Sequence, residues 1–163
     1  NYNKLRFLEN HDQPRIRSFV HDERTLVNYT ALLYFLKGTT LIYAGQEFEN
    51  EHLPSLFECD VIDRATGRDL SALMRRLYKI KSSMFGAADW FRAEADDARD
   101  IAVCQRGSDG RRFIGVFPLK AKPGEITVDA SDGEYEELIS GGTVRVAGGR
   151  LTGTGEPVII RVE

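Results

Sequence analysis

The sequence contains little cysteine, no long apolar run and no concentration of positive charge, and each absence argues against a class of protein. The two cysteines, Cys59 and Cys104, form no CxxC motif and have no metal-ligand spacing. We therefore expect two unpaired thiols, with a disulfide as the alternative. No apolar run approaches the roughly 18 residues that a membrane helix needs. The formal net charge is −3, the pI is about 5.7 and no basic stripe is visible. We therefore expect neither a membrane nor a nucleic-acid partner.

The rest of the composition is that of a globular protein. Of the 163 residues, 42% are hydrophobic and 29% are charged, which fits one large domain or two small ones. The chain starts with Asn1 and enters an apolar segment within a few residues. We interpret it as a piece of a longer protein, so the absence of a targeting segment leaves its localisation unknown.

Strand and helix patterns alternate in the first half of the chain. Leu5, Phe7 and Leu8 predict a short buried strand, and residues 40–44 predict a second one. A helix capped by Asp22 and running to about Lys37 separates them, and a further helix capped by Asp69 runs to a stop at Gly86. This order predicts parallel pairing of the two strands. The apolar stripes of the helices are Leu26, Tyr29, Leu33 and Leu36, and Leu70, Leu73, Met74, Leu77, Ile80 and Met84.

The pattern changes near Gly86. From Ala87 onward there is no helical period, and short β-rich runs alternate with Gly or Asp turns, which predicts an antiparallel sandwich. The last run, 158–162, is nearly all apolar, which indicates a central strand. The runs are 101–105, 113–117, 126–128, 135–139, 143–146 and 158–162.

Polar residues end both predicted strands of the first half. Glu9, Asn10, His11 and Asp12 follow the first strand, and Gln46 and Glu47 follow the second. In an α/β barrel, this carboxyl-terminal rim carries the chemistry. The alternative is an ordinary turn, because Asn and Asp favour turns and a proline, Pro14, follows. Glu9 and Arg15 either bracket the Asp12 carboxylate or pair with each other.

Two segments resemble the α-amylase family of glycoside hydrolases. Phe7-Leu-Glu-Asn-His-Asp12 resembles its fourth signature, Phe-x-x-Asn-His-Asp, at the end of the seventh barrel strand. Residues 38–47 are similar to its eighth strand, Gly-x-Pro-x-Ile-Tyr-x-Gly-x-Glu, with Thr40 in place of the proline. Residues 54–57, Ile62 and residues 75–81 resemble the segment that leads into the last barrel helix, and the β-rich end resembles domain C. The resemblance implies the C-terminal part of a (β/α)8 TIM barrel, residues 1–86, and an antiparallel Greek-key β-sandwich, residues 87–163.

The resemblance also implies a function. The parent protein is expected to hydrolyse or transfer α-linked glucose units with retention, acting on an α-glucan or maltooligosaccharide. Asp12 corresponds to the carboxylate that stabilises the transition state, and His11 to a residue that binds the same sugar. Asn10, Arg15, Gln46 and Glu47 are expected to support this site.

The family's other catalytic motifs are absent. The nucleophile and the general acid come from a Gly-x-Arg-x-Asp motif and a Glu-containing motif, and neither occurs in this sequence. The family's calcium ligands also lie largely upstream, so we assign no metal or cofactor to this chain. We expect the chain to be inactive alone, and the open edge of an incomplete barrel favours self-association. The alternative is a non-catalytic carbohydrate-binding or interaction module derived from the same family.

Two aromatic residues stand near the start of the predicted sandwich. Trp90 and Phe91 either pack between the two domains or stack on a sugar. The sequence favours packing, because aromatic side chains usually contribute buried area. The lone histidines His21 and His52 lie in polar contexts, and we expect both at the surface.

Overall fold

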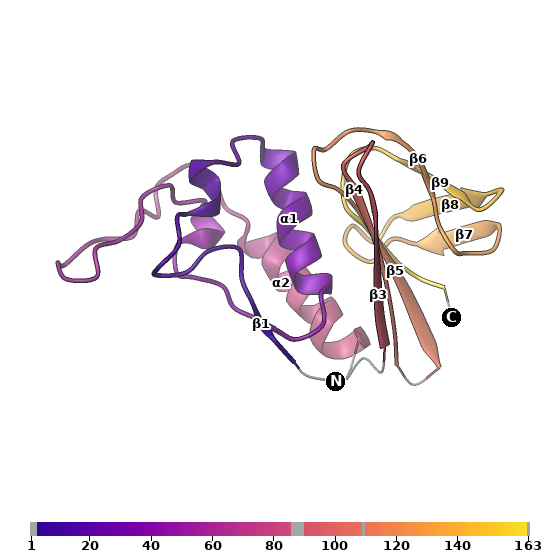
Figure 1. Ribbon diagram of the computed structural model, residues 1–163, viewed down its shortest axis with the longest axis horizontal. Helices are drawn as coiled ribbons and strands as arrows, with labels where there is room; N and C mark the ends of the chain where they lie inside the picture. The colour runs from indigo at the N-terminus through magenta and orange to yellow at the C-terminus, as the bar shows by residue number, and fades with distance from the viewer. Residues whose placement is uncertain (1–2, 86–89, 109, 163) are drawn as a thin grey trace.

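The computed structural model describes residues 3–85, 90–108 and 110–162. A short parallel ladder, a pair of helices and two antiparallel sheets follow one another in space (Figure 1). The ladder joins β1 (Leu5–Arg6) to β2 (Thr39–Thr40), and the helices are α1 (Glu23–Phe35) and α2 (Ser71–Lys79). One sheet has the order β10-β5-β4-β3 and the other β6-β9-β8-β7. Their strands are β3 (Trp90–Asp96), β4 (Ile101–Ser108), β5 (Arg111–Pro118), β6 (Gly124–Thr127), β7 (Gly133–Glu136), β8 (Thr143–Ala147), β9 (Arg150–Gly153) and β10 (Val158–Arg161).

α1 begins where the sequence predicts, whereas α2 begins one residue later than predicted, with Leu70 and not Asp69 at its N-cap. The Asp22 carboxylate accepts a hydrogen bond from the Thr25 amide at 2.7 Å, which satisfies a free donor in the first turn of α1. Asp69 accepts one from the Ser71 amide at 2.7 Å. α2 continues into a π-helix over Ile80–Phe85, and the predicted stop at Gly86 lies outside the described residues. No helix in the described part of the chain is long and apolar enough to cross a membrane.

The parallel pairing of the first two strands is confirmed, but the prediction that the first is buried is wrong. β1 pairs with β2 in parallel, with Leu5 opposite Thr39. Leu5 is 57% exposed and Phe7 is 41% exposed. α1 covers one side of this segment, where Leu8 and Leu33 help line an apolar hollow of about 270 Å³. The other side of the ladder faces away from the helices (Figure 1).

The antiparallel sandwich is confirmed, but the prediction that its last strand is central is wrong. In the ladder order, β10 is an end strand that pairs with β5, and its other edge forms an isolated bridge between Ile160 and Glu137. Ile159 packs among the residues that contact the helices, whereas Val158 and Ile160 pack against the second sheet. The run is apolar because both of its faces are covered, and this does not require a central position. Strands β3 and β9 were not predicted, since neither contains an apolar run.

The helices and the first sheet share one apolar core. Phe35 of α1 and Phe117 of β5 are fully buried, and their ring centroids lie 5.5 Å apart at an interplanar angle of 60°. Leu77 of α2 and Cys104 of β4 complete the contact. Both cysteines are unpaired, and burial raises the pKa of the Cys104 thiol to about 12. This core fixes the helix layer on the sandwich.

We predict that Phe117→Ala lowers the free energy of unfolding by about 3–5 kcal/mol, because it leaves a cavity beside Phe35. The matched control is Phe57→Ala, at a ring that is 92% exposed, and it should change stability by less than about 0.5 kcal/mol. Urea unfolding followed by circular dichroism measures both. Equal effects of the two substitutions would contradict the assignment of the core.

Three cationic side chains meet the C-terminal end of α1. Lys81 Nζ donates to the Leu36 carbonyl at 2.7 Å, Arg106 Nη1 to the Phe35 carbonyl at 2.8 Å, and Arg6 Nε to the Lys37 carbonyl at 3.2 Å. They satisfy carbonyls that a helix leaves free and balance its negative end. Burial, followed by the charges of Arg106 and Arg6, lowers the pKa of Lys81 to about 8.

This lowered pKa predicts a pH dependence of stability. The Lys81 pKa is about 8 in the fold, and the ordinary lysine pKa of 10.5 applies to the unfolded chain. Between these two values the unfolded chain binds more protons, so the contribution of Lys81 to the free energy of unfolding rises with pH. We expect the wild-type protein to gain stability relative to Lys81→Met between about pH 7 and about pH 10 in urea unfolding. A stability difference that does not change with pH would contradict the burial of this charge.

Candidate functional site

The site is built on the segments that follow β1 and β2. These strands run parallel, so their carboxyl ends lie at the same edge. The Leu41 amide donates to the Arg6 carbonyl at 2.8 Å, which keeps the two chains adjacent just beyond the ladder. The polar segment that begins at Glu9 and the loop that begins at Gly45 therefore start from neighbouring positions.

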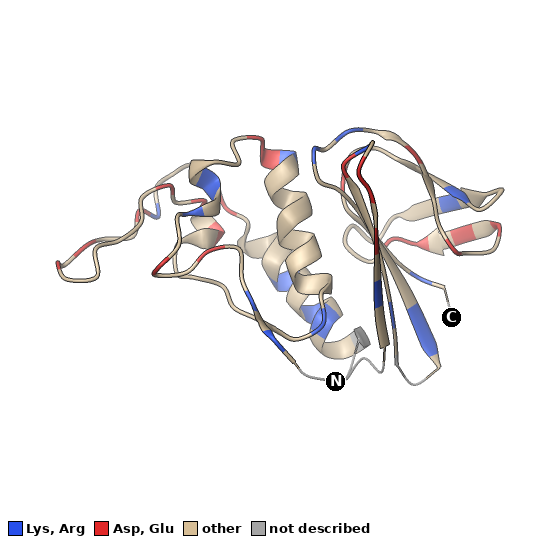
Figure 2. Cartoon of the chain, in the orientation of Figure 1, with Lys and Arg blue, Asp and Glu red and all other residues tan. Residues whose placement is uncertain are grey.

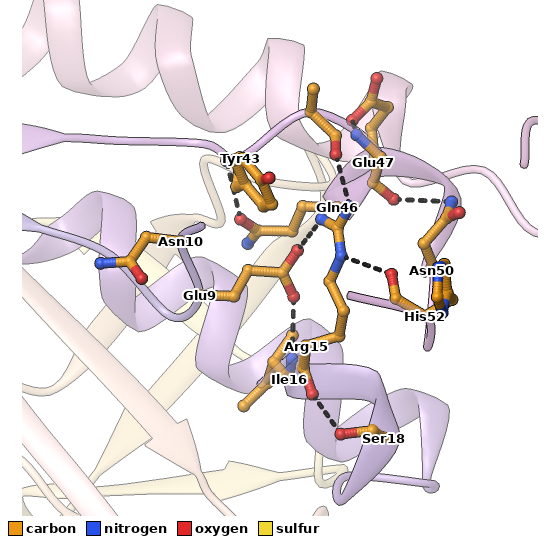
Figure 3. A network of polar contacts seen from close by, with 12 residues as sticks. Glu9, Asn10, Arg15, Ile16, Ser18, Tyr43, Gln46, Glu47, Asn50 and His52 are labelled. Carbon is orange, nitrogen blue, oxygen red and sulfur yellow. Dashed lines mark hydrogen bonds and ion pairs between the residues drawn. The ribbon is translucent and has the colours of Figure 1, made fainter. Parts of the chain in front are cut away.

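A buried ion pair forms the base of the site (Figure 3). Arg15 Nη1 lies 2.6 Å from Glu9 Oε1, and the two side chains are 0% and 1% exposed. The Ile16 amide donates to Glu9 Oε2 at 2.8 Å. Burial raises the pKa of Glu9, while the hydrogen bonds from Arg15 and Ile16 oppose the rise. Of the two arrangements open from the sequence, Glu9 and Arg15 pair with each other.

Arg15 also connects the two strand ends. Its Nη2 donates to the Ala44 carbonyl at 2.9 Å and its Nε to the His52 carbonyl at 3.1 Å. Its guanidinium carbon lies 4.4 Å from the centre of the Tyr43 ring. One side chain thus holds the loop after β1, the segment after β2 and the loop near residue 52 together (Figure 3).

His11 and Asp12 lie in an exposed turn above this base. The Asp12 amide donates to Asn10 Oδ1 at 2.9 Å, which closes the turn. His11 Nε2 lies 3.2 Å from Asp12 Oδ2, and the side chains are 60% and 61% exposed. The turn predicted as an alternative is present, and it is compatible with a rim site because its base is fixed by Glu9. The part that Asp12 plays in catalysis stays a prediction.

Gln46 and Glu47 shape the neighbouring loop. Gln46 is buried; its Oε1 accepts from the Tyr43 amide at 3.4 Å, and its Nε2 has no hydrogen-bond partner among the described residues. Glu47 Oε2 accepts from the Gly45 amide at 2.9 Å. The hydrogen bonds that the structure describes for these two side chains stay within their own loop and do not reach the turn of His11.

Gly45 is required for this packing. Its φ is +93°, and a Cβ atom would lie 2.8 Å from Ile62 Cγ2 and 3.3 Å from Arg15 Nη2. A side chain would be strained by the backbone conformation and would displace the guanidinium. Asn50 Nδ2 donates to the Gly45 carbonyl at 3.1 Å, which fixes the loop further.

Sequence reasoning missed a second buried charge cluster beside the first. Glu49 Oε2 lies 3.4 Å from Arg17 Nη1 and 3.7 Å from Arg68 Nη1, and Glu49 and Arg17 are both nearly fully buried. Burial raises the pKa of Glu49, and the two guanidinium groups oppose this rise. The signal in the sequence was Glu49, a further glutamate two residues after Glu47.

The described residues offer no candidate metal centre. No three or more His, Cys, Asp or Glu side chains in this part of the chain are grouped so that they could hold a metal ion. We therefore assign none of the described residues as a calcium ligand.

Comparison with known proteins decides the family. The family model for the alpha amylase catalytic domain matches residues 1–107, and that for the bacterial alpha amylase C-terminal domain matches residues 92–160. The chain belongs to the α-amylase family. It is 26% identical over 132 residues to alpha-amylase 2 of Schwanniomyces occidentalis, covering 77% of this chain and 26% of that protein.

Solved α-amylase structures show the same fold. An alpha-amylase from Lactobacillus plantarum matches with a TM-score of 0.89 and 32% identity, over 99% of this chain and 38% of that one. A maltogenic alpha-amylase from Thermotoga neapolitana matches with a TM-score of 0.81 and 20% identity, over 99% and 41% of the two chains. The chain thus has the fold of the C-terminal barrel strands and the β-sandwich of these α-amylases, and it spans less than half the length of the relatives it matches.

We predict that Arg15→Ala lowers the free energy of unfolding by about 3–5 kcal/mol, because it leaves the Glu9 carboxylate buried without its partner. The double variant Glu9→Leu with Arg15→Met should be less destabilised, since no unpaired charge remains. The control is Arg150→Ala, which breaks an exposed pair with Glu125 and should lower stability by about 0–1 kcal/mol. Urea unfolding of the three variants measures the order of their free energies of unfolding. A double variant less stable than Arg15→Ala would contradict this account.

Proposed function

We propose that the chain is the C-terminal part of a retaining α-glucan-acting hydrolase or transglycosylase, with residues 1–86 in the catalytic barrel and residues 87–163 in domain C. The observation that carries the proposal is the Asn10–Asp12 turn, fixed at the carboxyl-terminal edge of parallel strands by the buried pair of Glu9 and Arg15. The barrel part of the chain lies within the match to the catalytic domain of the family.

In this proposal Asp12 stabilises the transition state. Its carboxylate is exposed, and it accepts hydrogen bonds from sugar hydroxyls that strengthen as the ring takes up oxocarbenium character. His11, whose Nε2 lies 3.2 Å from this carboxylate, forms a hydrogen bond with the same sugar. The fixed backbone of the turn matters, because electrostatic stabilisation depends on groups that do not have to reorganise during the reaction.

Asp12 alone does not complete a retaining glycosidase. That reaction needs a nucleophile and an acid/base carboxylate about 5–5.5 Å apart. The motifs that carry them in the family do not occur in this sequence. We therefore propose that these groups come from the part of the barrel that this chain does not include, and that the chain alone is inactive.

The substrate class is proposed from the family. Two proteins with a similar fold were solved with a bound ligand: a variant of AmyP with maltotriose, and the alpha-amylase of Geobacillus thermoleovorans with acarbose. They are 14% and 12% identical to this chain, so they support the fold. The exposed Leu5 and Phe7 side chains further suggest that the chain alone self-associates, which its mass in solution tests.

We predict that the 163-residue chain releases no reducing sugar from soluble starch above a preparation that carries Asp12→Asn. In the full-length protein, Asp12→Asn should lower kcat on the order of 10²-fold or more, because it removes a charge that acts in the transition state. Asp97→Asn, at an exposed position in the sandwich, is the control and should leave kcat unchanged. Turnover by the chain alone, or full activity of the Asp12→Asn protein, would refute the proposal.

A further inference from the structure

Trp90 lies on the sandwich in a position that the sequence did not predict. Phe91 packs against the core shared with the helices, as expected. Trp90, the first residue of β3, points to the opposite face of the sheet and is 42% exposed. Phe91 therefore packs between the sandwich and the helices, as the sequence predicted, whereas Trp90 does not.

The indole ring of Trp90 packs against the backbone of Gly107, a residue without a side chain. Trp90 stands directly opposite Gly107 of β4 in the ladder. A Cβ atom on Gly107 would lie 2.4 Å from Nε1, 2.6 Å from Cε2 and 2.8 Å from Cζ2 of the indole. A glycine inside a strand commonly marks such a close approach. The ring is therefore held in place while much of it stays open to solvent.

Polar residues occupy neighbouring ladder positions on the same face of the sheet. Gly107 stands opposite Arg112 of β5, and Arg92 stands opposite Gln105. Arg112 Nη1 donates to Asp129 Oδ2 at 2.8 Å and lies 3.4 Å from Gln105 Oε1. Figure 1 shows that the end of the sheet where β3 begins extends beyond the second sheet, and Figure 2 shows basic residues on these strands.

A single exposed aromatic side chain is common and carries no inference alone. Here the ring lies over a glycine at the edge of a sheet, and Arg92, whose side chain is 67% exposed, follows two residues later on the same face. A glucose ring has an apolar face of C–H groups and a rim of hydroxyls, and this combination of aromatic and polar groups matches both.

We propose that the Trp90–Gly107 platform is a surface site that binds an α-1,4-linked glucan chain. The inference rests on the proposed α-glucan-acting function for the choice of ligand. The helices α1 and α2 lie between strand β3 and the segment that follows β1 (Figure 1). The site is therefore outside the cleavage site, and it anchors the protein to polymeric substrate.

The test uses the one tryptophan of the chain. Because Trp90 is the only tryptophan in the sequence, its fluorescence reports on this site alone. We expect titration of the 163-residue chain with β-cyclodextrin, a cyclic α-1,4-glucan, to change the emission in a saturable way. Soluble starch in a native gel should retard the chain.

Substitutions separate the platform from other surfaces. Trp90→Leu keeps apolar contact with Gly107 without an aromatic face, and Gly107→Ala displaces the ring; each should weaken retardation by starch about tenfold. Tyr78→Ala, which removes another exposed aromatic side chain, and Asp97→Asn, at an exposed position of the sandwich, should leave retardation unchanged. Circular dichroism verifies that each variant is folded.

Three results of these experiments would contradict the proposed Trp90–Gly107 site. No change of emission with β-cyclodextrin, or undiminished retardation of Trp90→Leu, overturns the platform. Retardation that is lost in Asp12→Asn but kept in Trp90→Leu places binding at the rim and also overturns the platform. Starch hydrolysis by the full-length protein tests the proposed function separately, so a failure of the platform and a failure of that function are distinguishable.

Discussion

The buried ion pair of Glu9 and Arg15 is the constraint on which the site depends. Removing two charges from water is unfavourable, and the pair is tolerated because each charge is well bonded. Arg15 reaches Glu9, the Ala44 carbonyl and the His52 carbonyl, and the Ile16 amide holds the other oxygen of Glu9. The segments after both strands are therefore fixed to one guanidinium. The Arg15 guanidinium, which is fully buried, therefore fixes the position of the exposed turn that carries Asp12.

The helix layer relates this site to the sandwich. α1 packs against β5 through Phe35 and Phe117, and its last carbonyls accept hydrogen bonds from Arg6, Lys81 and Arg106. These donors come from the first strand, the π-helix and the sandwich. The sandwich is thus bound to the barrel segment by an apolar contact and by charges at one helix end. The sandwich covers the side of these two helices that lies away from the ladder of β1 and β2 (Figure 1).

The sequence allowed much of the fold to be predicted, because its signals are local. The Asp22 cap, the change of period near Gly86 and the Gly and Asp turns need no knowledge of distant contacts. The predictions that were wrong depend on how the layers pack together. Leu5 is exposed because no described element covers its side chain. The last strand ends the ladder order of its sheet although both of its faces are covered. At the site, the polar residues were found, but the choice between two partners for Arg15 required the path of the chain between residues 9 and 52.

The central claim is that the fixed turn presents Asp12 to the reacting sugar. A crystal structure of the full-length protein with a maltooligosaccharide inhibitor tests it most directly. The account predicts the Asp12 carboxylate within about 3.2 Å of sugar hydroxyls, His11 on the same sugar, and the pair of Glu9 and Arg15 unchanged beneath them. An inhibitor bound in the barrel with Asp12 turned away from it would contradict the account.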